Sequence, residues 1–261
     1  MTVDGRHESP EERQERLAEF VLGRGKSTAQ ELAPMFGVSL MTIHRDLDEL
    51  AERGVVRKFR GGVTAQPSGV FESNVAYRRK SMLTQKQAIA RHAARHVESG
   101  MSLILDDSTT AFALVAHLAP ARPLHVGTNF LPAMRELSRV RGVGLTGFGG
   151  DYDPLHDSFL GVTCVEAVQS LRVDAVFVST SALSGGFAYH QEERIVAVKR
   201  AMLEVAAVRY LLLDHTKLGR TALHRLVPVD AFDVVIVDAG ADRNVVAELK
   251  SHDVRVEVAG E

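Results

Sequence analysis

Short amphipathic segments occupy the first 65 residues of the chain and predict a run of helices. In the first segment Leu17, Phe20 and Val21 recur at helical spacing. The preceding Ser-Pro-Glu-Glu at 9–12 has the pattern of a capping box with proline at the first helical position, and two glycines close the segment. These features predict a first helix with one apolar face.

A second helical segment is predicted over 28–36, before a tight turn at 37–39 that contains glycine. The serine or the threonine at 27–28 can cap it. Helical spacing allows Leu32, Met35 and Phe36 to share one face.

A third helix begins after the turn, with Ser39 as its cap and Gly54 at its end. Ile43, Leu47 and Leu50 follow at i, i+4 and i+7 and predict a buried face. Two helices joined by such a turn have the form of a DNA-binding helix-turn-helix, in which the second helix contacts the bases. The candidate DNA-binding residues of this helix are Ser39, Met41, Thr42, His44 and Arg45.

The segment VVRKFRGGVTA at 55–65 alternates basic and apolar residues up to a Gly-Gly turn. It contains no acidic residue, so Arg57, Lys58 and Arg60 predict a basic β-wing suited to phosphate contact. The alternative is a three-helix interaction module whose charges are only solvated. The coincidence of turn, caps and wing favours a winged helix-turn-helix domain over 9–65.

The pattern changes after residue 65. Proline, glycine and serine without periodicity predict a linker over 66–80, and a helix is predicted over 85–98. Seven apolar runs then alternate with helical segments: SLILDD, PLHVGT, VGLTGFGG, DAVFVST, YLLLDH, DVVIVDAG and VRVEVA. Such alternation predicts an α/β domain over 81–261 with a parallel-rich sheet covered on both faces.

Composition narrows the class of protein. The 261 residues suffice for one large and one small domain. The net charge of -2 does not indicate a DNA-binding protein, so a prediction of DNA binding must rest on local motifs. The single cysteine, Cys164, excludes a disulfide framework and a cysteine-based zinc cluster, and its apolar context predicts a buried thiol. The charged N-terminal segment and the lack of a long apolar run predict a cytoplasmic protein without membrane contact.

Polar residues follow the predicted strands, and ligands of parallel α/β sheets bind beyond the carboxyl ends of strands. GFGGDY has Tyr152 where a dinucleotide fingerprint needs its third glycine, which disfavours a dinucleotide. The candidate effector-binding residues at this edge are Asp106, Asp107, Ser108, Thr109, Thr110, Thr128, Asn129, Gly149 and Gly150, with Ser179, Thr180, Asp214, Lys217 and Asp238 beside them.

The turn at 108–110 can receive a phosphate, helped by the dipole of the helix that follows, and Lys217 can supply the compensating charge. Thr128 and Asn129 are candidates for sugar hydroxyls. Alternatively, Lys217 is an ordinary surface lysine, and Thr128 and Asn129 only cap the end of a strand. His190 and His215 have no second ligand at metal-site spacing, so we expect no metal, and nothing predicts a cofactor.

VSLMTIHRDLDELAERGVVRKFRGGV resembles the winged helix of the DeoR family of bacterial regulators. The resemblance implies that Thr42, His44 and Arg45 approach DNA and that the basic residues of 57–60 lie in the wing. His44 stands where the family usually has arginine. Imidazole cannot make the bidentate contact that a guanidinium group makes with guanine. Membership of the DeoR family would therefore not predict the operator sequence that this chain binds.

The second half resembles the effector-binding domain of the same family through LDDSTT, VGTN, GFGG, DAVFVSTSALSGG and LLLDHTKLG. That domain is related to ribose 5-phosphate isomerase, and EERIVAVKRAM and LLLDHTKLG are similar to segments of that enzyme. The resemblance implies a sugar-phosphate pocket and adds Glu193 to the candidate effector-binding residues. The enzyme's lysine before its glycine run is missing, since Leu183 and Ser184 stand there, and its aspartate-rich segment is reduced to Asp174.

Isomerisation needs a positioned carboxylate base and a cation beside the developing oxyanion, and this constellation is incomplete. We therefore expect no enzyme, but a repressor of carbohydrate catabolism that binds operator DNA as a homodimer or homotetramer and is modulated by a sugar phosphate. The alternatives are a sugar-phosphate isomerase, and a DNA-binding protein whose α/β domain only oligomerises. Asp107 would repel a phosphate dianion, so either it points away from the pocket or the effector is less anionic.

Overall fold

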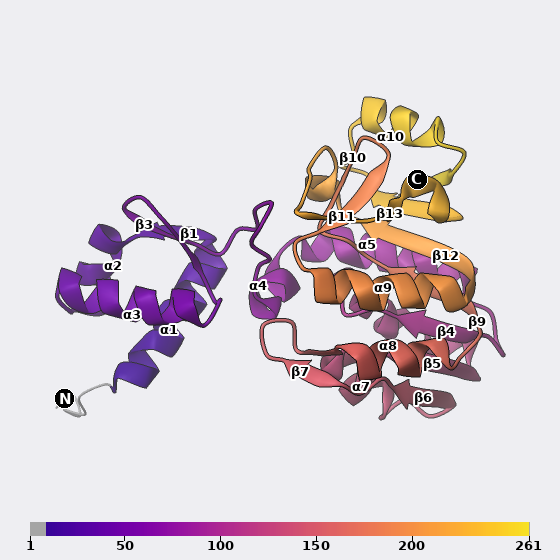
Figure 1. The fold of residues 1–261 in the computed structure, drawn as a ribbon, viewed down its shortest axis with the longest axis horizontal. Coiled ribbons are helices and arrows are strands. Elements are labelled where there is room, and N and C mark those ends of the chain that lie inside the picture. The colour runs from indigo at the N-terminus through magenta and orange to yellow at the C-terminus, as the bar shows by residue number, and fades with distance from the viewer. Residues whose placement is uncertain (1–8, 261) are drawn as a thin grey trace. The chain divides into compact units, whose positions relative to one another are not determined.

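The computed structural model describes residues 9–260, and the chain forms two compact units that meet in sequence between Ser81 and Met82 (Figure 1). The predicted boundaries at 65, 80 and 81 stay predictions. The segment predicted as a linker contains a short helix, α4 (Val75–Lys80), which Asn74 caps by accepting a hydrogen bond from the backbone N–H of Ala76 at 2.7 Å.

From residue 9 up to α4, the first unit contains three helices and a three-stranded antiparallel sheet in the order β1-β3-β2. Its elements before α4 are α1 (Pro10–Arg24), β1 (Lys26–Thr28), α2 (Ala29–Phe36), α3 (Leu40–Glu52), β2 (Arg57–Phe59) and β3 (Gly62–Thr64). The two strands after α3 form the hairpin expected of a wing, so the predicted winged helix-turn-helix architecture is confirmed.

Local hydrogen bonds explain where these helices begin. Ser9 and Glu12 form the predicted capping box of α1, with Glu12 N–H donating to Ser9 Oγ at 3.1 Å and Ser9 N–H to Glu12 Oε2 at 2.9 Å. Thr28, of the two proposed residues, caps α2. Ser39 caps α3 by accepting from the N–H of Thr42 at 3.1 Å.

The apolar faces of the three helices meet in one core that includes Leu17, Leu32, Ile43 and Leu47. Met35 lies at the surface of this unit, with 52% of the residue exposed. Only eight residues make up α2, so burying Leu32 and Ala33 against the core turns Met35 outward.

A seven-stranded sheet, parallel throughout, forms the centre of the second unit in the order β15-β14-β12-β9-β4-β5-β6. These strands are β4 (Ser102–Leu105), β5 (Leu124–Thr128), β6 (Val143–Gly147), β9 (Val173–Val178), β12 (Ala206–Leu213), β14 (Val234–Asp238) and β15 (Arg255–Ala259). Each of the seven predicted apolar runs supplies one of them, which confirms the predicted α/β fold with a parallel sheet.

Helices cover both faces of this sheet. The helices of the unit are α5 (Leu83–Ala93), α6 (Thr109–Phe112), α7 (Leu131–Leu137), α8 (Val162–Gln169), α9 (Glu193–Val205) and α10 (Arg243–Lys250), and short 3-10 turns include η1 (Ala94–His96) and η4 (His215–Lys217). The helices α8 and α9 bury Cys164 and Met202 in one core with Val176 and Leu211 of the sheet. On the other face α5 packs against β12, β14 and β15.

Two small antiparallel sheets complete the unit. They are the hairpin β7 (Asp151–Asp153) and β8 (Ser158–Leu160), and the strands β10 (Ala182–Ser184), β11 (Phe187–His190) and β13 (His224–Pro228). The helix predicted over 85–98 ends earlier, because its last turn tightens into η1. Within residues 9–260 no helix is long and apolar enough to cross a membrane.

Candidate DNA-binding surface and sensor site

The N-terminal half of α3 presents the predicted DNA-binding side chains to solvent. Ser39, Met41, His44 and Arg45 are exposed and Thr42 is half-buried. The side chains of Ser39 and Thr42 also share a hydrogen bond of 2.9 Å. The helix thus buries Ile43 and Leu47 and leaves hydroxyl, imidazole and guanidinium groups on one accessible surface, as a recognition helix requires.

A buried ion pair fixes α3 against α1. Arg13 Nε lies 2.7 Å from Asp46 Oδ2 and Arg13 Nη2 lies 3.1 Å from Asp46 Oδ1, while Asp46 is fully buried. Gln14 adds hydrogen bonds to Asp46 at 3.3 Å and to Glu49 at 2.6 Å. These contacts orient the recognition helix. No local pattern in the sequence predicts them, because Arg13 and Asp46 look there like two more surface charges.

The wing carries the predicted basic residues at its surface. Arg57, Lys58 and Arg60 are exposed, and Lys58 pairs with Asp48 of α3. An exposed pair of this kind contributes little stability, so DNA phosphate can replace the carboxylate. The turn needs its second glycine: a Cβ on Gly62 would lie 2.4 Å from the carbonyl oxygen of Ser27 on the neighbouring strand.

In the second unit, the parallel strands bring the predicted effector-binding side chains to one edge of the sheet. Asp106 follows β4 and accepts a hydrogen bond from the backbone N–H of Ser179, which follows the neighbouring β9, at 2.8 Å. Lys217 of η4, after β12, donates to Ser179 Oγ at 3.1 Å. The carboxyl ends of three adjacent strands are thereby joined by hydrogen bonds.

Asp106 and Asp107 point inward, toward a lysine that the sequence analysis missed. Lys199 of α9 is 2% exposed; its Nζ binds Asp106 Oδ2 and lies 2.9 Å from Asp107 Oδ1. Burial alone would lower the pKa of Lys199, but the two carboxylates raise it, so the lysine is charged. Asp107 also accepts from Ser158 Oγ of β8 at 3.1 Å, so its carboxylate is committed to internal partners.

A sequence signal for Lys199 was present. In α9 it shares a face with Ile195 and Met202, at i+4 and i−3 from them, and all three are buried. A lysine on the apolar face of an amphipathic helix needs a buried counter-charge, and the two consecutive aspartates after β4 were the obvious candidates.

Some polar groups of the turn predicted to receive a phosphate already have hydrogen-bond partners within the same loop. Ser108 N–H donates to Asp106 Oδ1 at 3.0 Å, and Ser108 Oγ caps α6 by accepting from Ala111 N–H at 3.0 Å. Thr110 differs, because its buried Oγ1 has no hydrogen-bond partner among the described residues. Thr109, between them, is buried.

Thr128, the last residue of β5, and Asn129, the next residue, both serve as strand-end caps. Thr128 Oγ1 accepts from Phe130 N–H at 3.1 Å, and Asn129 Nδ2 donates to the carbonyl oxygen of Phe159 at 2.9 Å. The amide oxygen of Asn129 is buried without a partner in the described part of the chain. This oxygen and Thr110 Oγ1 are polar groups that a ligand could satisfy.

Two aspartates stabilise the loops after β12 and β14. Burial opposes ionisation of Asp214, but Lys217, the hydrogen bonds from Thr216 and the charge of Lys86 bring its pKa below the usual range. Asp214 accepts from the N–H of Thr216 at 3.2 Å and so caps η4. Asp238 Oδ2 lies 2.8 Å from Nδ1 of His215.

The remaining predicted residues differ in their surroundings. Gly149 has open space where a Cβ would stand, whereas a Cβ on Gly150 would lie 2.4 Å from the carbonyl oxygen of Leu160, and Gly150 has a φ of +143°. Gly150 is therefore required by the β7–β8 hairpin whether or not it touches a ligand. Glu193 is exposed as the first residue of α9. Cys164 is buried, and burial together with the charge of Asp107 raises its pKa to about 12.

Comparison with known proteins gives the family of this chain. A family model described as the DeoR C terminal sensor domain matches residues 81–239, and one described as the DeoR-like helix-turn-helix domain matches residues 13–68. The chain belongs to the DeoR family. The resemblance stated from the sequence is confirmed, and the chain is a DNA-binding transcriptional regulator with a sensor domain.

Relatives of this DeoR-family regulator match it along nearly its whole length. It is 32% identical over 251 residues to the uncharacterized HTH-type transcriptional regulator YgbI of Escherichia coli strain K12, covering 96% of this chain and 98% of that protein. It is 28% identical over 247 residues to the glycerol-3-phosphate regulon repressor of the same strain, covering 93% and 96%. Among solved structures, ribose 5-phosphate isomerase A from Methanocaldococcus jannaschii matches with a TM-score of 0.40 and 15% identity, covering 53% of this chain and 55% of that one.

Proposed function

We propose that this DeoR-family regulator represses genes of carbohydrate catabolism and that a phosphorylated sugar bound at the carboxyl edge of the sheet changes its affinity for the operator. The observation that carries the proposal is the position of Lys217 at this edge beside Ser179. The unsatisfied oxygens of Thr110 and Asn129 supply acceptors for sugar hydroxyls. The name of the glycerol-3-phosphate regulon repressor supports a phosphorylated effector.

In the proposed DNA complex, α3 enters the major groove and the wing contacts phosphates. Gel-shift titration against the DNA upstream of its own gene tests this. Arg45→Ala should weaken specific binding by about 1–3 kcal/mol if Arg45 contacts a base, and Arg57→Ala should lower the slope of log affinity against log salt by about 1. Arg243→Ala, in α10 of the sensor unit, is the control. The absence of a sequence-specific shift at moderate salt would contradict the proposal.

A thermal-unfolding panel of sugar phosphates and their unphosphorylated counterparts tests the effector. A ligand at 100 times its dissociation constant stabilises the folded chain by about 2.7 kcal/mol. Lys217→Gln should remove the preference for phosphorylated compounds, whereas Lys250→Gln, at an exposed position of α10, should keep it. If no compound stabilises the protein, the sensor domain only oligomerises and the effector proposal fails.

The sensor domain is proposed to bind without turnover. Glu193, the carboxylate that matches the isomerase segment, is exposed, whereas Lys199 six residues later is held by Asp106 and Asp107. Incubation of the purified protein with ribose 5-phosphate should yield no ketose. Ketose formation that is lost in Glu193→Gln would overturn this part of the proposal.

A further inference from the structure

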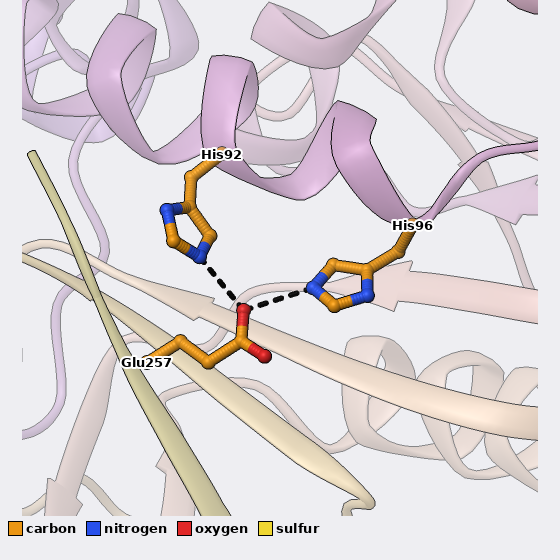
Figure 2. Close-up of side chains that lie close together, drawn as sticks. All are labelled: His92, His96 and Glu257. Atoms are coloured by element: carbon orange, nitrogen blue, oxygen red, sulfur yellow. Dashed lines mark hydrogen bonds and ion pairs between the residues drawn. The ribbon is translucent and has the colours of Figure 1, made fainter. Parts of the chain in front are cut away.

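Two histidines of the sensor unit meet one carboxylate on the α5 face of the sheet (Figure 2). His92 lies in the last turn of α5 and His96 in η1, four residues later, so both point to the same side. Glu257 reaches them from the edge strand β15. His92 Nε2 lies 2.7 Å and His96 Nε2 2.8 Å from the same oxygen, Glu257 Oε2.

The two oxygens of Glu257 have separate partners. Oε1 pairs with Arg255 Nη2 at 2.7 Å, which leaves Oε2 to the histidines. Two imidazole nitrogens and one carboxylate oxygen are a ligand set that Zn²⁺ takes in proteins, with water at the fourth position.

We propose that His92, His96 and Glu257 form a site for a divalent transition metal ion, represented by Zn²⁺. Their ligand atoms lie within 4.8 Å of one another. In a tetrahedral site with bonds of about 2.0–2.2 Å, ligand atoms lie roughly 3.3–3.5 Å apart. Each histidine must therefore retreat from Oε2 by about half an ångström, which a side-chain rotation supplies. The three side chains are between 12% and 19% exposed, so an ion can enter from solvent.

One feature lowers the expected affinity. When Nε2 of His92 binds a metal, Nδ1 must carry the proton, and this buried atom has no hydrogen-bond partner in the described chain. Loss of such an orienting partner costs roughly 10- to 100-fold in metal affinity. We therefore expect binding at this site to be weaker by this factor than at a site whose histidines are both held by acceptors.

A second group of three potential ligands, Asp153, His156 and Glu192, is less suited to a metal. Asp153 Oδ1 already accepts from the N–H groups of Leu155 at 2.9 Å and of His156 at 3.2 Å, so the hairpin turn uses this oxygen. Among the described residues, by contrast, the hydrogen-bond partners of Glu257 Oε2 are the two histidines that would become its fellow ligands. A metal ion bound by His92, His96 and Glu257 would link α5, the first helix of the sensor unit, to the edge strand β15.

Calorimetric titration of the EDTA-treated full chain with Zn²⁺ tests the site. We expect about one Zn²⁺ per chain and a higher midpoint of thermal unfolding. His92→Gln and His96→Gln should each weaken binding by more than the 10- to 100-fold expected for an outer partner. The matched control is His117→Gln. His117 contacts Gln87 of α5, the helix that carries His92, but lies outside the cluster of three ligands. Binding by either cluster variant that equals that of the unmodified chain overturns the proposal.

If circular dichroism shows that the variants do not fold, a crystallographic experiment on the unmodified chain tests the proposal. Crystals soaked in Zn²⁺ should show an anomalous peak at the zinc edge between the three side chains. A peak elsewhere, or no uptake of Zn²⁺, overturns the proposal. The effector site takes no part in this test, so its outcome is independent of the proposed function.

Discussion

At the scale of the residue, Lys199 has a large predicted effect on stability. Lys199→Met would leave Asp106 and Asp107 buried without their shared cation, and breaking a buried pair in this way costs about 3–5 kcal/mol. Urea unfolding of the full chain measures this loss. Lys250→Met, at an exposed position of α10, should stay within about 0.5 kcal/mol of the unmodified chain. A loss below about 1 kcal/mol for Lys199→Met would contradict the assigned role.

At the same scale, Asp107 places a second carboxylate near the proposed phosphate site. This residue is 3% exposed and bonded to Lys199 and Ser158, so we expect that it does not contact a ligand directly. Asp107→Asn keeps the shape and removes one negative charge. We expect phosphorylated compounds to bind roughly fivefold tighter, or about 1 kcal/mol, with unphosphorylated ones unchanged. An equal change for both classes in the thermal panel would show that charge is not the cause.

At the scale of the element, the pair of Arg13 and Asp46 sets the position of the recognition helix. Asp46→Ala should destabilise the first unit by about 3–5 kcal/mol and abolish operator binding, because it removes the buried carboxylate that joins α3 to α1. Asp48→Ala is the control on the same helix, since Asp48 is exposed and pairs with the exposed Lys58. It should leave stability within about 0.5 kcal/mol and DNA affinity equal or higher. Similar losses in both variants would refute the assignment.

Elements were also what the sequence predicted best. Helical period and caps located α1, α2 and α3, because these features depend on residues close in the chain. Apolar runs located all seven parallel strands, because a strand covered on both faces is apolar along its length. Long-range partners were missed: Lys199 meets Asp106 across 93 residues and Asp46 meets Arg13 across 33. His92 and His96 have helical spacing within the predicted helix, but Glu257 lies 165 residues beyond His92, so no local pattern joins them.

At the scale of the whole molecule, regulation requires that effector and operator change each other's binding. A winged helix of this size contacts little DNA alone, so we expect a homodimer or homotetramer on repeated half-sites, which sedimentation at several protein concentrations measures. A monomer that binds the operator at full affinity would contradict this expectation.

The coupling itself gives a further prediction. A compound that changes operator affinity by a factor between about 5 and 150 must have its own affinity changed by the same factor when operator DNA is bound. The two factors are measured separately, by gel shift with and without the compound and by calorimetry with and without the operator. Lys217→Gln should weaken binding of the phosphorylated compound to both the free and the DNA-bound chain, while operator affinity without the compound stays unchanged. Unequal factors would mean that the compound and the operator do not act on one shared equilibrium of the protein.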